Sequence, residues 1–184
     1  MDNLNHLAEQ VQALRKELDQ AGQTGQEDKL SMILFSGDLD KALAAFIIAT
    51  GAVAMGLEVV IFLTFWGTPL FRKSEGRALG KDLMSKMFGW MLPKGADKAS
   101  LSQMHMAGAG TQMLKTLMTK KNVASLAEMI TLAGQLGVKV YICEMSMNLM
   151  GFRREEMIAY PELQYAGVAT FLAEAKKSKI QLFI

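Results

Sequence analysis

Four short apolar runs limit the fold of this chain more than any other feature. The runs are continuous rather than alternating with polar residues, and they lie at 30–36, 58–65, 138–143 and 180–184. Segments with helical patterning separate them, at 41–56, 78–90, 109–120, 125–136 and 165–176. Strands that are apolar on both faces and alternate with helices are typical of a parallel sheet covered on both sides. The sequence therefore predicts an α/β fold with a mostly parallel sheet.

The longest uncharged stretch runs from 42 to 57, and apolar residues resume at 59–63 after Glu58. A membrane-spanning helix needs about 20 continuous apolar residues. The first run is shorter than that and rich in Ala and Gly, whereas the second is β-branched and aromatic. A buried helix followed by a buried strand explains both runs better, so membrane association is not expected.

The N-terminal part of the chain has a different pattern. Apolar residues are spaced by three and four positions, as in a heptad repeat, at Leu4, Leu7, Val11, Leu14 and Leu18. This spacing predicts an amphipathic helix over 1–22, a polar linker over 23–29 and an α/β domain over 30–184. The helix could dock on its own domain or associate with another copy, because isolated helices of this length are marginal without a partner surface.

Composition and charge exclude several classes of protein. Hydrophobic residues make up 51% of the chain and charged residues 21%, which excludes a disordered protein. The 20 basic and 18 acidic residues give a net charge of +2, so the charge predicts no nucleic-acid partner. His6 and His105 are far apart, and no metal-ligand spacing surrounds them. The Gly-rich segment 108–110 lacks the third glycine of a dinucleotide loop. Neither a metal nor a cofactor is therefore predicted.

Cys143 is the single cysteine of the chain. A single thiol excludes an internal disulfide and a CxxC redox pair. The first residues of the chain also lack the basic segment and the apolar run of an export signal. Both observations predict a cytoplasmic protein.

Three turns are expected at the carboxyl edge of the sheet, where ligands and chemistry gather in parallel α/β folds. They are Ser36-Gly37-Asp38, Phe65-Trp66-Gly67 and Cys143-Glu144-Met145-Ser146. Residues 146–150 could form a short helix with Ser146 as its N-cap, and the free N–H groups of such a helix would favour a thiolate. Glu144 would oppose it if its side chain pointed inward.

Cys143 and His105 each allow two interpretations. A cysteine at this edge could carry sulfur as a persulfide or form a mixed disulfide with another protein. It could equally be a buried structural residue, which is a common fate of cysteine. His105 could orient or protonate a substrate, or it could be a loop residue that caps a backbone carbonyl.

Four blocks of the sequence together resemble the DsrE/DsrF-like proteins, most closely the branch labelled peroxiredoxin-like. The blocks are 36–51, 62–67, 104–111 and 143–147, and the resemblance extends from about residue 30 to the C-terminus. It implies a three-layer α/β/α domain, a role in sulfur relay on a single cysteine, and assembly into oligomers, and some members of this branch are membrane-associated. Cys143 matches the position of the family's cysteine. A peroxiredoxin site would need Thr or Ser three residues earlier, where this chain has Val140.

The sequence therefore predicts a sulfur carrier or sulfurtransferase with Cys143 as the sulfur-bearing nucleophile. Its expected partners are sulfur donor and acceptor proteins and further copies of itself. The residues expected to line the site are Ser36, Gly37, Asp38, Trp66, Gly67, His105, Glu144, Met145 and Ser146. Two alternatives remain: a non-catalytic assembly or docking module with a structural cysteine, and a small-ligand binder at the strand edge.

Overall fold

A five-stranded parallel sheet forms the centre of the computed structural model, which describes residues 9–13, 15, 26–74, 87, 92–104 and 106–184. The strand order is β4-β3-β2-β1-β5. The strands are β1 (Glu27–Leu34), β2 (Glu58–Leu63), β3 (Lys139–Cys143), β4 (Leu163–Ala166) and β5 (Ser178–Phe183). All four apolar runs predicted as strands therefore lie in one parallel sheet.

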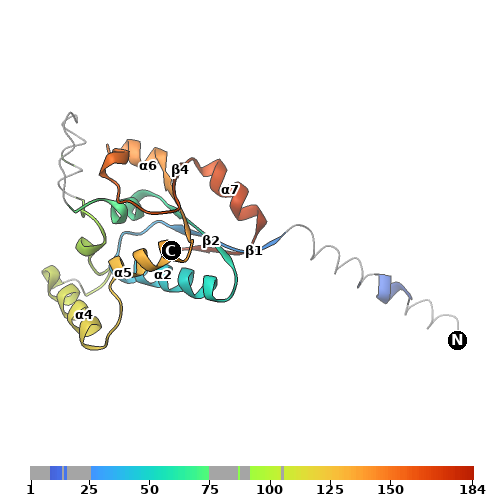
Figure 1. The fold of residues 1–184 in the computed structure, drawn as a ribbon, viewed down its shortest axis with the longest axis horizontal. Coiled ribbons are helices and arrows are strands. Elements are labelled where there is room, and N and C mark those ends of the chain that lie inside the picture. Colours follow the sequence, from blue (N-terminus) through green and yellow to red (C-terminus); the bar gives the residue numbers. More distant parts are fainter. Residues whose placement is uncertain (1–8, 14, 16–25, 75–86, 88–91, 105) are drawn as a thin grey trace.

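Helices cover both faces of this sheet, as Figure 1 shows. The helices α2 (Leu39–Ala54) and α5 (Leu126–Gln135) pack together on one face, and α7 (Val168–Lys177) lies on the other. The remaining helices are α4 (Ala109–Lys120) and α6 (Glu144–Leu149), with short 3₁₀ helices η1 (Phe65–Phe71), η2 (Ala96–Lys98), η3 (Met106–Gly108) and η4 (Arg154–Glu156). The predicted three-layer α/β/α architecture is thus confirmed.

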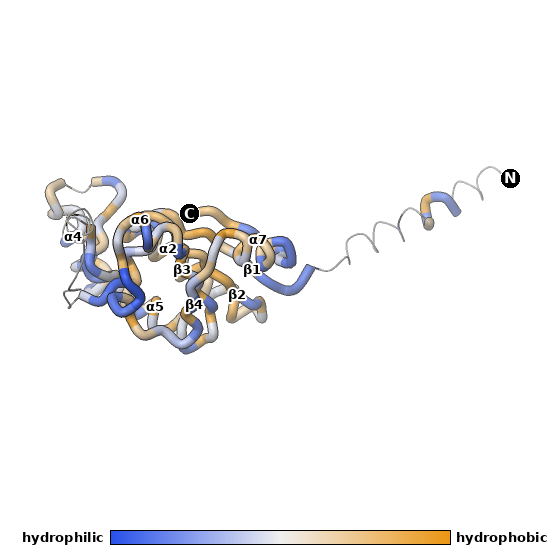
Figure 2. The backbone as a smooth tube through the Cα atoms, turned by 90° about the horizontal axis from the view of Figure 1, so that it is seen from above, coloured by the Kyte–Doolittle hydropathy of each residue, from blue (hydrophilic) through white to orange (hydrophobic). Residues whose placement is uncertain are grey.

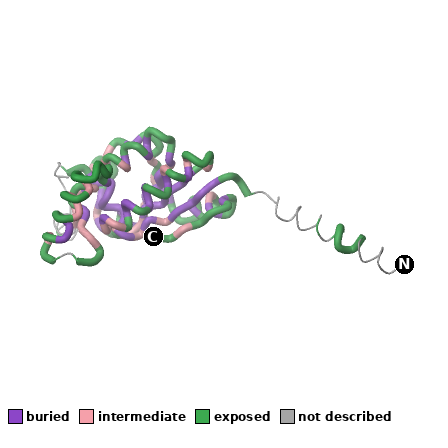
Figure 3. The backbone as a smooth tube through the Cα atoms, turned by 90° about the horizontal axis from the view of Figure 1, so that it is seen from below, coloured by how far each residue is buried: buried purple, intermediate pink, exposed green. Residues whose placement is uncertain are grey.

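Each face of the sheet has its own apolar core. The larger core lies under α2 and α5 and includes Phe46, Ile61 and Ile142. The smaller one lies under α7 and contains Val60, Phe62, Tyr141, Cys143, Ala166, Phe171 and Ala175. The central strands β1, β2 and β3 are largely apolar in Figure 2 and largely buried in Figure 3, because helices cover both of their faces. Two-sided burial explains why the apolar runs do not alternate with polar residues.

The uncharged stretch at 42–57 folds as predicted, into a helix that precedes a strand. The helix α2 ends before Gly56, whose φ of +84° is a backbone conformation that favours glycine. Within the described ranges, no helix combines the length and apolar character needed to cross a bilayer.

The predicted helix at 165–176 is partly wrong, because its first residues belong to β4. The helix α7 begins only at Val168, after Gly167 as N-cap. Residues Leu163–Ala166 pair in register with Val140–Cys143 of β3. This short edge strand depends on a partner strand distant in sequence, and pairing of that kind overrides local helical patterning.

The N-terminal predictions fall mostly outside the described residues. Leu4, Leu7, Leu14 and Leu18 of the heptad spacing lie outside them, and so does the predicted helix at 78–90 apart from residue 87. Val11 is described, within a helical segment at 9–13, and its side chain is exposed. The strand β1 starts at Glu27, within the segment predicted as a linker. The domain boundaries remain predictions.

Candidate functional site

Cys143 is the last residue of β3 and the N-cap of α6. The short helix therefore begins at Glu144 rather than at Ser146, which corrects the predicted N-cap. This happens because the chain turns directly from the strand into the helix at Cys143 (φ −65°, ψ 112°). Cys143 is only 4% exposed. The cysteine thus combines burial with a position where the free N–H groups of a helix begin.

Cys143 packs in the smaller core, under α7. Its neighbour in the sheet is Ala166, since the two residues are register partners in β3 and β4. The rings of Phe62 and Phe171 stack in the same core with centroids 5.0 Å apart. Because β3 leads into α6 and β4 leads into α7, two helices start beside each other at this point of the sheet edge. The thiol is therefore enclosed by apolar side chains close to two helix starts.

Ser146 joins α6 to the end of β2. Its side chain is fully buried, and its hydroxyl and that of Thr64 are hydrogen-bonded over 2.9 Å. The Phe65 N–H donates to the same Ser146 oxygen over 3.0 Å. Phe65 has a φ of +43°, an uncommon conformation for an aromatic residue. Ser146 therefore holds a strained turn in place, and its hydroxyl already has two partners.

Glu144 and Met145, the next two residues after Cys143, are both directed to the surface. The Glu144 carboxylate accepts a hydrogen bond from the Arg154 guanidinium over 2.5 Å; the Arg154 side chain is exposed and that of Glu144 is about half exposed. Arg154 also lies over the ring of Tyr165, 4.5 Å from its centroid. Arg154 thus balances the negative charge next to the cysteine, while Met145 presents an exposed thioether.

The turns after β1 and β2 form a separate cavity of about 330 Å³. Ser36 Oγ donates to Asp38 Oδ2 over 2.8 Å, and Lys41 Nζ donates to the same oxygen over 2.8 Å. The lining consists of Phe35, Ser36, Gly37, Asp38, Lys41, Trp66, Pro69, Leu92, Pro93 and Ser100. Cys143 is not among these residues. The structure therefore divides the predicted site into a cysteine group (143–146) and a cavity group (36–38 and 66).

Two glycines allow the turns of the cavity group to pass close to each other. A Cβ on Gly37 would lie 2.3 Å from the carbonyl oxygen of Trp66. A Cβ on Gly67 would lie 2.3 Å from the carbonyl oxygen of Leu34. Real Cβ atoms do not approach backbone oxygens so closely, so both positions require glycine. Gly67 therefore supports the strand ends rather than contributing a group to the site.

His105, which the sequence predicts as a site-lining residue, lies outside the described residues. In the part of the chain that the structure describes, no cluster of three His, Cys, Asp or Glu side chains could hold a metal ion.

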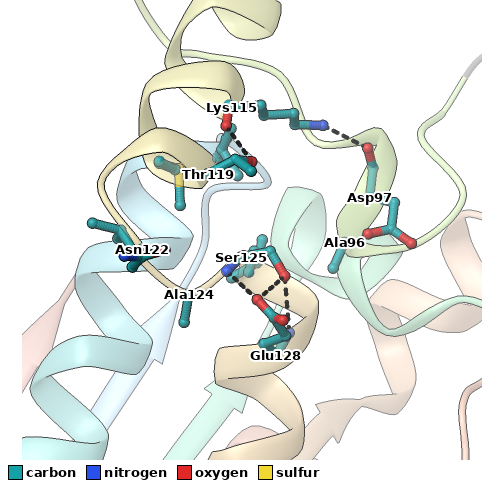
Figure 4. Close-up of a pocket in the computed structure, with 12 residues that line it drawn as sticks. Ala96, Asp97, Lys115, Thr119, Asn122, Ala124, Ser125 and Glu128 are labelled. Atoms are coloured by element: carbon teal, nitrogen blue, oxygen red, sulfur yellow. Dashed lines mark hydrogen bonds between the residues drawn. The ribbon is translucent and has the colours of Figure 1, made fainter.

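A larger cavity, of about 520 Å³, was missed by the sequence analysis (Figure 4). It lies between α4, α5 and η2, and Lys115 closes one side by donating to the Asp97 carbonyl over 2.7 Å. On another side, Ser125 and Glu128 form the capping box of α5. Hydrogen bonds from Ser125 hold the pKa of Glu128 below its usual value. The capping box is visible in the sequence, but the cavity depends on packing between distant segments.

Comparison with known proteins identifies the family. A model of the DsrE/DsrF/DrsH-like family matches residues 26–183. This chain belongs to that family. The chain is 47% identical over 161 residues to the uncharacterized protein YrkE of Bacillus subtilis (strain 168), which covers 88% of this chain and 99% of YrkE. It is 36% identical over 166 residues to the sulfur carrier protein DsrE2 of Allochromatium vinosum, which covers 86% of this chain and 99% of that relative. The family resemblance expected from the sequence blocks is thus confirmed.

Proposed function

We propose that this member of the DsrE/DsrF/DrsH-like family is a sulfur carrier that holds persulfide sulfur on Cys143. The observation that carries the proposal is the placement of the chain's single thiol, at the end of β3 and the start of α6. In parallel α/β folds, ligands bind at the carboxyl ends of the strands, which is the edge where Cys143 lies. The similarity to a protein named as a sulfur carrier supports the same role.

The proposed chemistry needs one thiol and no cofactor. The Cys143 thiolate attacks the outer sulfur of a donor persulfide, the donor S–S bond breaks, and the donor leaves as a thiolate. Cys143 then carries the extra sulfur as S–SH. An acceptor thiolate attacks that outer sulfur and releases the Cys143 thiolate. Each step breaks one bond to the sulfur and forms another, so no external oxidant or reductant is consumed.

The surroundings of Cys143 suit a protected persulfide. Burial in an apolar core slows the reaction of the outer sulfur with water and stray small thiols, without closing it off completely at 4% exposure. The first N–H groups of α6 lack partners within the helix and could stabilise a thiolate or a persulfide anion. Arg154, bonded to Glu144, offsets the adjacent negative charge. The Ser146 hydroxyl contributes indirectly, because its hydrogen bonds with Thr64 and Phe65 fix α6 against the end of β2.

Transfer also requires access, because an attacking sulfur must approach along the S–S axis. The cover over Cys143 is α7, in which only Phe171 and Ala175 are buried. Its residues Val168 and Leu172 are 61% and 58% exposed. A short helix with so few buried contacts belongs to the part of a fold that opens most easily. We propose that donor and acceptor proteins contact this exposed surface and displace α7 during transfer.

The remaining parts of the proposal concern partners and location. Sulfur donor and acceptor proteins are the expected partners, together with further copies of this chain. A single cysteine, which cannot form an internal disulfide, is typical of a protein in the reducing environment of the cytoplasm. A sulfurtransferase activity would then appear only when both donor and acceptor are present.

A discharge experiment tests the carrier role. The protein is first loaded with a low-molecular-weight persulfide, freed of the donor, and then mixed with an acceptor thiol. We expect the loaded wild type to return to its original mass while the acceptor gains persulfide sulfur. The Cys143→Ser variant should deliver none. Acceptor that gains as much sulfur from the Cys143→Ser variant would contradict a role for Cys143.

A small-ligand binder is the second candidate, favoured by the cavity beside Asp38 and Trp66. This cavity combines an aromatic side chain with the Asp38–Lys41 ion pair at the carboxyl edge of the sheet. A ligand bound there should raise the melting temperature of the wild type but not of a Trp66→Ala variant. Cys143→Ser should leave such binding unchanged, which separates the two functions.

A further inference from the structure

The strand β5 lies at an edge of the sheet with β1 as its neighbour. The Ile184 N–H donates to the Ile33 carbonyl over 2.9 Å, and the Ile184 carbonyl accepts from the Phe35 N–H over 2.8 Å. Alternate residues of a strand direct their backbone groups to opposite sides. The backbone groups of Ile180 and Leu182 therefore face β1, as those of Ile184 do. The outward-facing backbone groups belong to Lys179, Gln181 and Phe183.

Among the residues that the structure describes, nothing gives this edge the usual protection against pairing with another strand. Natural edge strands carry proline, bulges, unpaired charges or a covering element. The strand β5 has no proline, and its register irregularity lies between Glu27 and Leu30, on the β1 side. Lys179 is the single charged residue of β5, and its ammonium group donates to the Asp28 carboxylate over 2.6 Å, so its charge is paired. Ile180 is 41% exposed and Phe183 is 69% exposed.

The sequence of β5 is complementary to itself when two copies run antiparallel. With the pair centred on Gln181, Gln181 faces its own counterpart and Lys179 faces Phe183 of the second copy. All the outward backbone groups then find hydrogen-bonding partners. A register centred on Ile180 or on Leu182 would leave one of the outward residues without a strand residue opposite it. Hydrogen bonding therefore selects the Gln181 register.

The side chains agree with this register on both faces of the sheet. On the α2 face, Ile180 would lie against Leu182 of the second copy, which covers exposed apolar surface. On the α7 face, Lys179 would lie against the ring of Phe183, a favourable cation–π arrangement. The two Lys179 residues would sit at opposite ends of the strand pair, so no like charges face each other. We propose that two copies of this chain pair through β5, in antiparallel register about Gln181, and form one continuous sheet.

This pairing would leave the cysteine site free. Two strands, β2 and β1, separate β3 from β5, which places Cys143 roughly 14 Å from the paired edge at ordinary strand spacing. A two-fold axis perpendicular to the sheet would place the α7 covers of both copies on the same face. The inference does not depend on the proposed sulfur chemistry.

Cysteine pairs across the proposed interface test the register. The full chain carries Cys143→Ser, which removes the single native thiol, and either Ile180→Cys or Leu182→Cys. In the Gln181 register, positions 180 and 182 of different copies form a closely spaced pair with Cα atoms about 4.5 Å apart. Identical positions are more than about 7 Å apart and cannot form a disulfide without backbone movement. We expect oxidation to give a disulfide-linked dimer in the mixture of the two variants, and little in either variant alone.

Two controls make the result decisive. Lys179→Cys mixed with Phe183→Cys should also form a mixed dimer, and both positions are exposed, so folding is not at risk. Thr131→Cys, exposed on α5, should not form a dimer above background. Equal yields in single and mixed samples, or no dimer in either mixture at protein concentrations where circular dichroism shows folded protein, would overturn the proposal.

Discussion

Cys143 and Ala166 are register partners at the ends of β3 and β4, and a helix follows each of them within two residues. The cysteine therefore lies between the start of α6 and the start of α7. The α6 side offers backbone N–H groups, and the α7 side offers an apolar cover. The thiol therefore has backbone N–H groups on one side, which would stabilise a thiolate, and the helix α7 as a cover on the other. Substitutions in α7 test whether it controls access to the thiol.

Shortening Phe171 should expose Cys143. The Phe171 ring is buried and stacks on Phe62, so Phe171→Ala should lower the free energy of unfolding by about 3–5 kcal/mol. It should also accelerate alkylation of Cys143 by iodoacetamide, measured by mass spectrometry under folded conditions. Leu172→Ala, at an exposed position of the same helix, should change neither quantity appreciably.

A second control separates local opening from global unfolding. Phe46→Ala removes a buried ring from α2, on the opposite face of the sheet, and should cost a similar stability. If alkylation accelerates equally in Phe46→Ala and Phe171→Ala, Cys143 reacts through global unfolding. The interpretation of α7 as a local cover would then be wrong.

Ser146→Ala should destabilise the fold by about 1–3 kcal/mol. The change removes the hydroxyl that bonds both the Thr64 hydroxyl and the Phe65 N–H, and it leaves these partly buried polar groups without that partner. Urea unfolding measures the effect. Thr131→Ala removes an exposed hydroxyl that donates to its own helix, and should change stability by less than about 0.5 kcal/mol. Equal effects of the two changes would argue against a structural role for the Ser146 network.

Gly67→Ala should be poorly tolerated, because its Cβ would collide with the Leu34 carbonyl oxygen. We expect a loss of at least about 1–3 kcal/mol, as for other overpacked positions. Gly51→Ala is the matched control, since nothing lies within 4 Å of a Cβ there and the residue is inside α2. That change should raise stability by up to about 1 kcal/mol. Thermal melts of both variants give the comparison, and a neutral Gly67→Ala would contradict the close passage of the strand ends.

The Glu58 carboxylate should contribute to the free energy of unfolding in a way that depends on pH. Its hydrogen bond with Lys139, opposed by partial burial and aided by the charge of Lys29, holds the pKa of the Glu58 carboxyl below its ordinary value. A carboxyl group with a lowered pKa stabilises the fold above its unfolded-state pKa, and this contribution is lost as the pH falls through the folded-state value. The stability difference between wild type and Glu58→Gln should therefore shrink between about pH 6 and about pH 3. Urea unfolding across that range checks it, and a difference independent of pH would contradict the assignment.

Local signals predicted those features of the fold that depend on neighbouring residues. The uncharged stretch at 42–57 and the apolar run after it predicted α2 and β2, and the helical patterning at 125–136 predicted α5, which begins with the capping box of Ser125 and Glu128. The carboxyl end of β3 was likewise placed at Cys143. Each of these depends on composition or spacing within a few residues.

Features that depend on distant pairing were not visible in the sequence. The strand β4 exists because Leu163–Ala166 pair with β3. The residues predicted to line one site fall into two groups, because strand register decides which face of the sheet a side chain lies on. Cys143 lies in the core under α7, whereas Ser36–Asp38 lead into α2 on the other face. The cavity between α4 and α5 likewise brings together Asp97 and Ser125 through tertiary packing alone.

Intact-protein mass spectrometry after treatment with a persulfide donor tests whether Cys143 carries sulfur. We expect a gain of one sulfur, about 32 Da, in the wild type, because a persulfide forms only on a thiolate. Cys143→Ser should gain nothing under the same conditions, and peptide mapping should place the added sulfur on Cys143. A folded wild type whose Cys143 stays unmodified by both the donor and iodoacetamide would contradict the carrier role and assign the cysteine to the core.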